Sequence, residues 1–298
     1  MPSPTDTAPD WGVLSHPIRD AVPVNSPPWK DNAYICFWDT ESDVYGTLHV
    51  STSPNGEGRR ARVSLQHEGR VTEIIEPLEP GTFTSESITF DGGSEFSFDV
   101  PGLSGAVTST PHMSVADFSG DHEARAFTIV PDEPLIHYEQ AATITGNVTV
   151  GDTEIELHGY GFRDRSWGWR DESVSVVEYF GFMWVFDDFG ITGNRALGAD
   201  GVDYVTIFRV TETDAIAATS ASLTRDASGL FAATHLEFAD GTSLDVRGTH
   251  RAAGFWCPMG WERTGPTLST YDEFQHVRTS DGREGFGLIE QGITRQQY

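Results

Sequence analysis

The sequence predicts an all-β protein. Short segments in which apolar and polar residues alternate recur along the chain, Gly, Asp and Pro turn signals separate them, and extended helical periodicity is hard to find. The chain has 298 residues, of which 38% are hydrophobic and 21% charged, enough for one large or two ordinary β domains with packed cores. This spacing of strands and turns favours a sandwich or barrel over βαβ units.

The first half contains several such segments behind a Pro-rich, extended lead-in at residues 1–28. The expected strands are Tyr45–Ser51, Arg62–His67, Val71–Ile75, Ile88–Phe90 and Glu95–Val100. Turn sequences such as SPNGEG and DGG separate them, which is typical of β-hairpins.

The second half repeats this pattern more clearly. Two-residue turns at Gly151-Asp152 and Asp240-Gly241 are strong hairpin signals. The expected strands are Thr143–Val150, Thr153–His158, Tyr179–Phe186, Thr234–Ala239, Thr242–Gly248, Tyr271–Arg278 and Gly285–Glu290. The run IVPDEP interrupts the alternation near residues 130–136, so we expect β units at 29–135 and 136–298; one continuous curved β structure is the alternative.

The charge balance excludes several partners. The formal net charge is −26, which favours solubility and repels phosphate backbones, so no nucleic-acid partner is expected. No apolar run approaches the roughly 18 residues of a membrane span, and the N-terminus lacks the pattern of a secretory signal. We therefore expect a cytoplasmic protein without membrane insertion.

Cofactor motifs are missing as well. Cys36 and Cys257 are far apart and read as reduced core residues, and no CxxC, HExxH or GxSxG occurs. The histidines show no metal-ligand spacing, so no metal is expected. The single lysine, Lys30, lies outside any Schiff-base or P-loop context.

The segment from His158 to Ser173, HGYGFRDRSWGWRDES, concentrates glycine, arginine, tryptophan and aspartate. Trp and Arg together can build an aromatic-walled polar site, whereas the structural alternative is a salt-bridge and Trp plug that closes a barrel end. Asp164 lies between Arg163 and Arg165 in sequence. An arginine beside a carboxyl group lowers its pKa, but alternate side chains of a strand face opposite ways, so both arginines could point away from Asp164.

Three runs carry a family resemblance: Tyr138-Glu139-Gln140, the stretch from Gly159 to Gly168, and Gly285-Phe286-Gly287-Leu288-Ile289-Glu290. They resemble the carotenoid 1,2-hydratase (hydroxyneurosporene synthase) and AttH-like group, above all a bacterial branch with an R-D-x-S-W-G motif. The resemblance implies two lipocalin-like β-barrels packed side by side. It also implies hydration, cyclisation or isomerisation of isoprenoid, steroid-like or polyketide substrates without a redox cofactor. Asp164 matches the acid of the motif, while Arg165 stands where many relatives carry histidine.

Further candidates come from strand alternation. Glu178, Phe182 and Trp184 share one face of an aromatic strand and suit a pocket wall with an acid at one end, or ordinary core; Tyr179 lies on the other face. Trp256 and Trp261 belong to an aromatic cluster that forms a pocket lip or a packed loop.

Two acid–histidine pairs are also candidates. His276 and Glu290 lie on neighbouring strands of an expected hairpin, where cross-strand pairing could form a proton relay or a structural pair. His137 and Glu139 alternate on one strand face and could do the same.

These residues predict a cofactor-independent enzyme that moves protons on an apolar isoprenoid or polycyclic substrate. Asp164 is the expected acid, with Glu178 and the His276–Glu290 pair as alternatives. Trp167, Trp169 and Trp184 are expected to form walls that stabilise a cation, and Arg163 and Arg170 to act as clamps. The alternatives are a carrier of a hydrophobic small molecule and a degenerate structural partner. A buried acid facing the pocket distinguishes the enzyme from the carrier.

Overall fold

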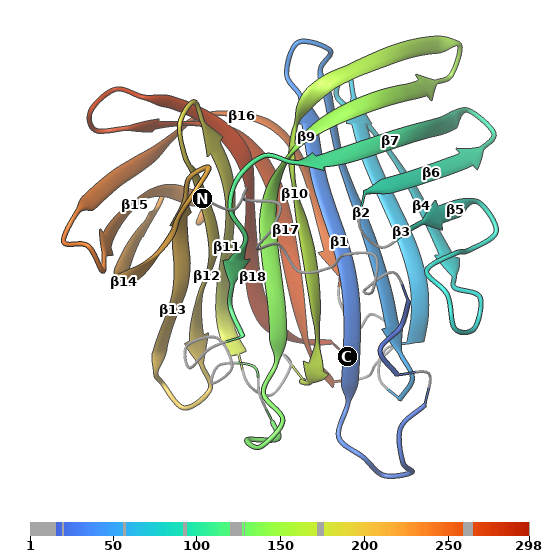
Figure 1. The fold of residues 1–298 in the computed structure, drawn as a ribbon, viewed down its shortest axis with the longest axis horizontal. Helices are drawn as coiled ribbons and strands as arrows, with labels where there is room; N and C mark the ends of the chain where they lie inside the picture. The colour runs from blue at the N-terminus through green and yellow to red at the C-terminus, as the bar shows by residue number, and fades with distance from the viewer. Residues whose placement is uncertain are drawn as a thin grey trace.

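The computed structural model describes residues 16–19, 21–55, 58–91, 94–119, 127, 129–171, 176–258 and 265–297. All eighteen elements over these residues are strands, and they form a ten-stranded antiparallel sheet beside a closed eight-stranded barrel (Figure 1). The prediction of an all-β fold with two lipocalin-like units is confirmed. No helix in the described part of the chain is long and apolar enough to cross a membrane.

The first sheet has the strand order β4-β3-β2-β1-β10-β9-β7-β6-β5, with β8 paired to β9. Its strands are β1 (Trp29–Asp39), β2 (Val44–Ser53), β3 (Gly58–His67), β4 (Arg70–Pro77), β5 (Ile88–Phe90), β6 (Glu95–Val100), β7 (Leu103–Pro111), β8 (Ala116–Asp117), β9 (Ile136–Val150) and β10 (Thr153–Trp169). The earliest strand, β1, therefore lies in the middle of the sheet, between β2 and β10.

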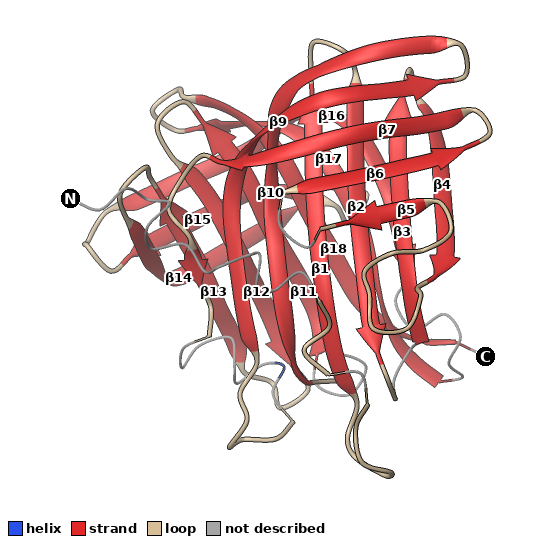
Figure 2. Cartoon of the chain, turned by 45° about the vertical axis from the view of Figure 1, so that its right-hand side comes forward, coloured by secondary structure: helices blue, strands red, loops and turns tan. Residues whose placement is uncertain are grey.

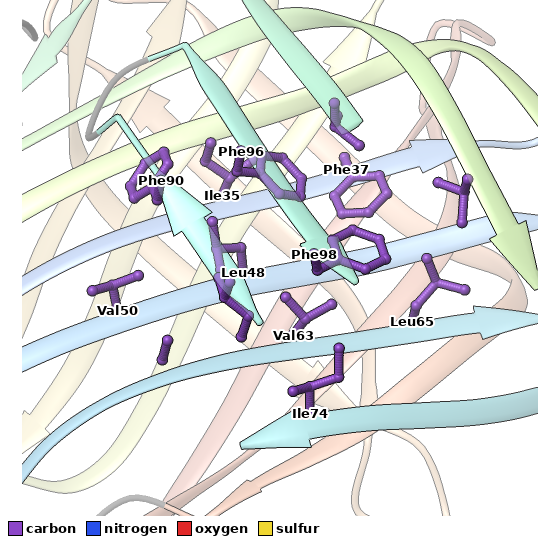
Figure 3. Packing of buried hydrophobic residues seen from close by; sticks show 14 of the residues in the cluster. Ile35, Phe37, Leu48, Val50, Val63, Leu65, Ile74, Phe90, Phe96 and Phe98 are labelled. Carbon is purple, nitrogen blue, oxygen red and sulfur yellow. The ribbon is translucent and has the colours of Figure 1, made fainter. Parts of the chain in front are cut away.

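The first sheet curls around its own apolar core. Phe90, Phe96 and Phe98 of β5 and β6 lie over Ile35 and Leu48 of β1 and β2 (Figure 3). All five side chains are buried in one cluster, because alternate residues of each strand face the inside of the curl. Hydrophobic burial of this face holds the unit together.

The barrel follows in chain order and closes on itself. Its strands are β11 (Val176–Phe186), β12 (Gly190–Gly198), β13 (Asp203–Val210), β14 (Ala215–Arg225), β15 (Phe231–Phe238), β16 (Ser243–Pro258), β17 (Gly265–Thr279) and β18 (Glu284–Gln297). Aromatic side chains that include Phe180, Phe182, Trp184 and Phe231 fill the interior. The barrel interior is a packed core, since side chains fill small closed barrels.

A third cluster joins the two units, which lie side by side in Figure 2. Cys36, Trp38 and Phe162 of the sheet pack with Met183 and Phe286 of the barrel. The rings of Trp38 and Phe286 are 5.7 Å apart between centroids. The units therefore share an apolar interface at the level of these residues.

The predicted domain boundary needs correction. The hairpin around Gly151-Asp152 is present, but its strands β9 and β10 belong to the first sheet, where they pair with β7 and β1. The chain changes from sheet to barrel between Trp169 and Val176 instead of at residue 135. The run IVPDEP interrupts the alternation because it connects β8 to β9 within one sheet.

Candidate active site between the two units

The two faces of β10 separate the acid of the central motif from its arginines. Arg165 forms an ion pair with Asp31, and both side chains are fully buried. Arg163 donates a hydrogen bond to Gln140 Oε1 at 2.5 Å. Asp164 lies on the opposite face, as strand alternation predicts, and lines a cavity towards the barrel.

A polar row crosses the sheet at the level of Asp164. In the register of β9, β10, β1 and β2, the residues Glu139, Asp164, Tyr34 and His49 stand directly opposite one another. His137 lies two residues before Glu139 on the same face of β9. Its Nε2 is 2.9 Å from Asp164 Oδ2 and 3.3 Å from Glu139 Oε1. Cross-strand neighbours on one face are close enough to interact, so the register assembles this group.

A second polar row on the barrel faces the first across the cavity. Glu290 of β18 stands opposite Asp272 of β17, and Tyr179 donates a hydrogen bond to Glu290 Oε2 at 3.1 Å. Gly181 flanks Glu290 on β11. A Cβ at Gly181 would lie 2.8 Å from Glu290 Oε2 and 2.9 Å from the Tyr179 hydroxyl, so glycine leaves the space for this hydrogen bond.

The cavity between the rows has a volume of about 90 Å³. Its lining residues are Asn32, Tyr34, His49, Phe127, His137, Asp164, Ser166, Arg170, Tyr179, Met183, Cys257, Leu268, Thr270 and Glu290. The lining contains more polar groups than the sequence predicted for an apolar pocket. The volume is below the roughly 300–1,000 Å³ of ordinary ligand pockets, so this space suits one reacting group of a larger molecule.

The carboxyl groups of the barrel row have raised pKa values. Burial raises the pKa of Glu290 well above its usual range, and the negative charges of Asp272 and Asp164 raise it further. Burial also raises the pKa of Asp272 to about 6, although the nearby Arg62 guanidinium lowers it. Glu290 is therefore a buried carboxylic acid that can donate a proton at neutral pH.

The pKa values of the groups in the sheet row are shifted by the same physical causes, burial and neighbouring charges. Burial raises the pKa of Glu139, and its contact with His137 acts in the opposite direction. Burial lowers the pKa of His49 to about 3, with a further contribution from Arg60 and Arg62, so this imidazole is neutral. Burial and the charge of Asp272 raise the pKa of Tyr34 well above 10, which keeps its hydroxyl protonated.

The aromatic face of β11 lies inside the barrel instead of on the cavity. Phe182 and Trp184 belong to the interior cluster, while Tyr179 and Met183 on the other face line the cavity. Glu178 contacts Arg225 and Arg195 in partly exposed ion pairs. The predicted wall of Phe182 and Trp184 with Glu178 as its acid is wrong, because a closed barrel buries that face in its core.

The tryptophans of the central segment also lie away from the cavity. Trp167 packs on Tyr138, and Trp169 packs on Trp29 and donates to Glu133 Oε2 at 2.7 Å. Trp256 is 57% exposed, and Trp261 lies outside the described residues. The aromatic groups that do line the cavity are Tyr34, Phe127 and Tyr179.

The predicted His276–Glu290 pair does not form. In the β17–β18 register His276 stands opposite Phe286. The residue opposite Glu290 is Asp272, four positions before His276 on β17. His276 contacts Phe286 and His250, and it lines a different surface cleft. Glu290 pairs instead with Asp272.

The sequence did not indicate two residues that line the cavity, Tyr34 and His49, nor Asp272 opposite Glu290. The sequence did contain a signal for Tyr34, because Tyr34, Cys36 and Trp38 alternate on one face of β1. His137 and Arg170 were singled out and do line the cavity.

This architecture is that of a two-unit β protein with a cavity between its units that contains several ionisable side chains. Over 280 residues, 15–294, the sequence matches the model of the family described as a domain of unknown function, DUF7064, and the chain belongs to that family. No curated protein matches the sequence at a significant level.

Solved structures share the fold at low sequence identity. CghA in complex with Sch210972 is 14% identical with a TM-score of 0.61, covering 91% of this chain and 89% of that one. An AttH-like protein from Nitrosomonas europaea is 12% identical with a TM-score of 0.62, covering 88% and 91%. Kievitone hydratase from Nectria haematococca is 11% identical with a TM-score of 0.55, covering 90% and 89%. At these identities the similarity establishes the fold alone.

Proposed function

We propose that this protein is an enzyme that moves protons on an isoprenoid or polycyclic substrate without a redox cofactor. Its reaction is hydration or dehydration, cyclisation or isomerisation. The observation that carries the proposal is that a buried carboxylic acid, Glu290, and the hydrogen-bonded pair Asp164–His137 line the same cavity. Two proton-handling groups in different environments are what general acid–base catalysis requires.

In the proposed hydration, Glu290 donates its proton to one carbon of an alkene, forming a C–H bond. A water molecule, or a hydroxyl of the substrate in a cyclisation, bonds to the other carbon and loses a proton to the Asp164–His137 pair. Return of that proton to Glu290 through water completes the cycle, and dehydration is the reverse. The faces of Tyr34, Phe127 and Tyr179 line the same space and can stabilise the positive charge that develops on carbon.

Two further facts support an enzyme over a carrier. A carrier needs a cavity that encloses its cargo, whereas this cavity of about 90 Å³ is small and has several ionisable side chains in its lining. The carrier also has no use for a buried acid, which is costly to place in a protein interior. Among the proteins with this fold, one is named a hydratase and another was solved with Sch210972, which supports a reaction on a small organic substrate.

The test is a screen in labelled water. The full chain is incubated in H₂¹⁸O or D₂O with prenylated phenols, isoprenoid alkenes and polyketide alkenes, and the products are analysed by mass spectrometry. Hydration adds one labelled oxygen, and isomerisation or cyclisation in D₂O adds carbon-bound deuterium. Glu290→Gln should abolish the label while the protein keeps its fold. Compounds that bind tightly but return unlabelled would support the carrier and contradict the proposal.

A further inference from the structure

His137, Glu139 and Asp164 direct three potential ligand atoms to one point. His137 Nε2 is 2.9 Å from Asp164 Oδ2 and 3.3 Å from Glu139 Oε1, and the three residues can each offer an atom within 4.8 Å of the others. We propose that this triangle is a binding site for a divalent first-row transition-metal cation. The inference goes beyond the proposed acid–base function and does not depend on it.

The distances fit coordination geometry. Histidine nitrogen and carboxylate oxygen bind Zn²⁺ at about 2.0–2.2 Å. Two ligand atoms at that distance lie about 3.0 Å apart at a right angle and about 3.4 Å apart at the tetrahedral angle. Both measured separations from His137 Nε2 fall at or near these values.

Two carboxylate oxygens lie near one imidazole nitrogen in the triangle. The Nε2 atom of an imidazole carries at most one hydrogen, yet two carboxylates approach it. Glu139 and Asp164 also stand directly opposite in the β9–β10 register, and their side chains are only 3% and 15% exposed. Like charges at such positions repel one another, and a divalent cation would neutralise both.

The ligands are held in place before any ion binds. Thr192 of the barrel donates a hydrogen bond to Glu139 Oε2, the oxygen that does not face His137. The ring of Phe118 stacks on the imidazole of His137 at 4.7 Å between centroids. Outer contacts of this kind fix the orientation of metal ligands in known sites.

An independent observation points to a ligand in this space. The hydroxyl of Tyr34 is buried, the residue being only 8% exposed, and finds no hydrogen-bond partner among the described residues. Tyr34 stands opposite Asp164 and lines the same cavity. A water molecule bound to the cation would give this hydroxyl a partner, and the cavity has room for it.

One imidazole and two carboxylates suit Zn²⁺ or Mn²⁺, with the remaining positions open to water. An ion bound to His137 and Asp164 would occupy the pair that accepts a proton in the proposed reaction. The two uses of the site therefore exclude one another, which makes binding of the ion separable from turnover.

The experiment measures binding without any substrate. The full chain, stripped with EDTA, is titrated with Zn²⁺ by calorimetry and with Mn²⁺ by electron paramagnetic resonance. We expect one site per chain, an affinity at least about 100-fold weaker in Glu139→Gln, and one about 10-fold weaker in Thr192→Val. Glu290→Gln, which removes a buried acid of the same cavity outside the triangle, should bind like the wild type.

A second readout covers variants that fail to fold. Coupling of bound Mn²⁺ to an imidazole nitrogen, measured by pulsed resonance on the wild-type protein, would show that a histidine is a ligand. No binding to the wild type, binding without that coupling, or unchanged affinity in a folded Glu139→Gln protein would each overturn the proposal.

Discussion

The two polar rows, one on the sheet and one on the barrel, surround their buried acids with different partners. On the sheet, Asp164 and Glu139 share the imidazole of His137. On the barrel, Glu290 and Asp272 stand opposite one another, and Glu290 accepts a hydrogen bond from the neutral hydroxyl of Tyr179. Burial raises the pKa of both barrel acids and also that of Glu139, but for Glu139 the contact with His137 opposes the rise. The histidine beside the sheet acids and the phenol beside Glu290 give one cavity two kinds of proton site.

The largest expected effect concerns the sheet row. Asp164→Asn should reduce turnover of a substrate found in the labelled-water screen by about 10²–10⁴-fold, the usual contribution of general acid–base catalysis. Thermal stability should change little, because the amide can still bond to His137 while Arg165 keeps its own partner, Asp31. A folded variant with wild-type turnover would remove Asp164 from the mechanism.

A substitution inside the barrel should lower the stability of the fold without a direct effect on turnover. Trp184→Ala empties a fully buried position and should cost about 3–5 kcal/mol in the free energy of unfolding, measured with denaturant. Tyr179→Phe is the matched change on the cavity face of the same strand, and it should lower turnover with a smaller loss of stability. If Trp184→Ala changes which substrates are turned over and leaves the free energy of unfolding unchanged, Trp184 lines the substrate pocket and is not part of the barrel core.

The barrel row predicts a dependence of stability on pH. Asp272 has a folded pKa of about 6, raised from 3.8, so its proton stabilises the folded state below pH 4, and this stabilisation is lost as the pH rises through 6. Asp272→Asn should therefore gain stability relative to the wild type between pH 4 and 8, by on the order of 3 kcal/mol at most. Denaturant titrations across this range measure the difference, and a constant difference would contradict it.

The smallest effect is expected outside both rows. Trp256 is 57% exposed, and its side chain packs on Tyr271 at the surface of β16. Trp256→Ala should change the free energy of unfolding by no more than about 0.5 kcal/mol and leave turnover unaltered. A clear rise in KM would instead support the pocket lip that the sequence suggested.

Local patterns predicted the strands well, because alternation and turn chemistry are short-range properties. Ile88–Phe90 and Glu95–Val100 have the predicted bounds, and the hairpin at Asp240-Gly241 is present. Asp164 and Glu290 were singled out and line the cavity.

The predictions that were wrong depend on which strands pair with one another over long distances in the sequence. The partner of Glu290 follows from the β17–β18 register, and a prediction of His276 instead of Asp272 was wrong by four positions. Which face of β11 meets the cavity depends on closure of the barrel, which no single strand encodes. The position of Tyr34 beside Asp164 joins residues 130 positions apart, and only the β1–β10 pairing reveals it.

That same β1–β10 pairing has a consequence for synthesis on the ribosome. One edge of β1 is completed only when residues 153–169 have been made, more than a hundred residues after β1 itself. At about 5–20 residues per second, this strand waits roughly 6–25 s without one of its neighbours. Every residue of β1 is buried in the final fold, so during that time the strand presents an unpaired backbone edge and uncovered side chains that invite pairing with other chains. We expect the nascent protein to need a holding chaperone until β10 emerges.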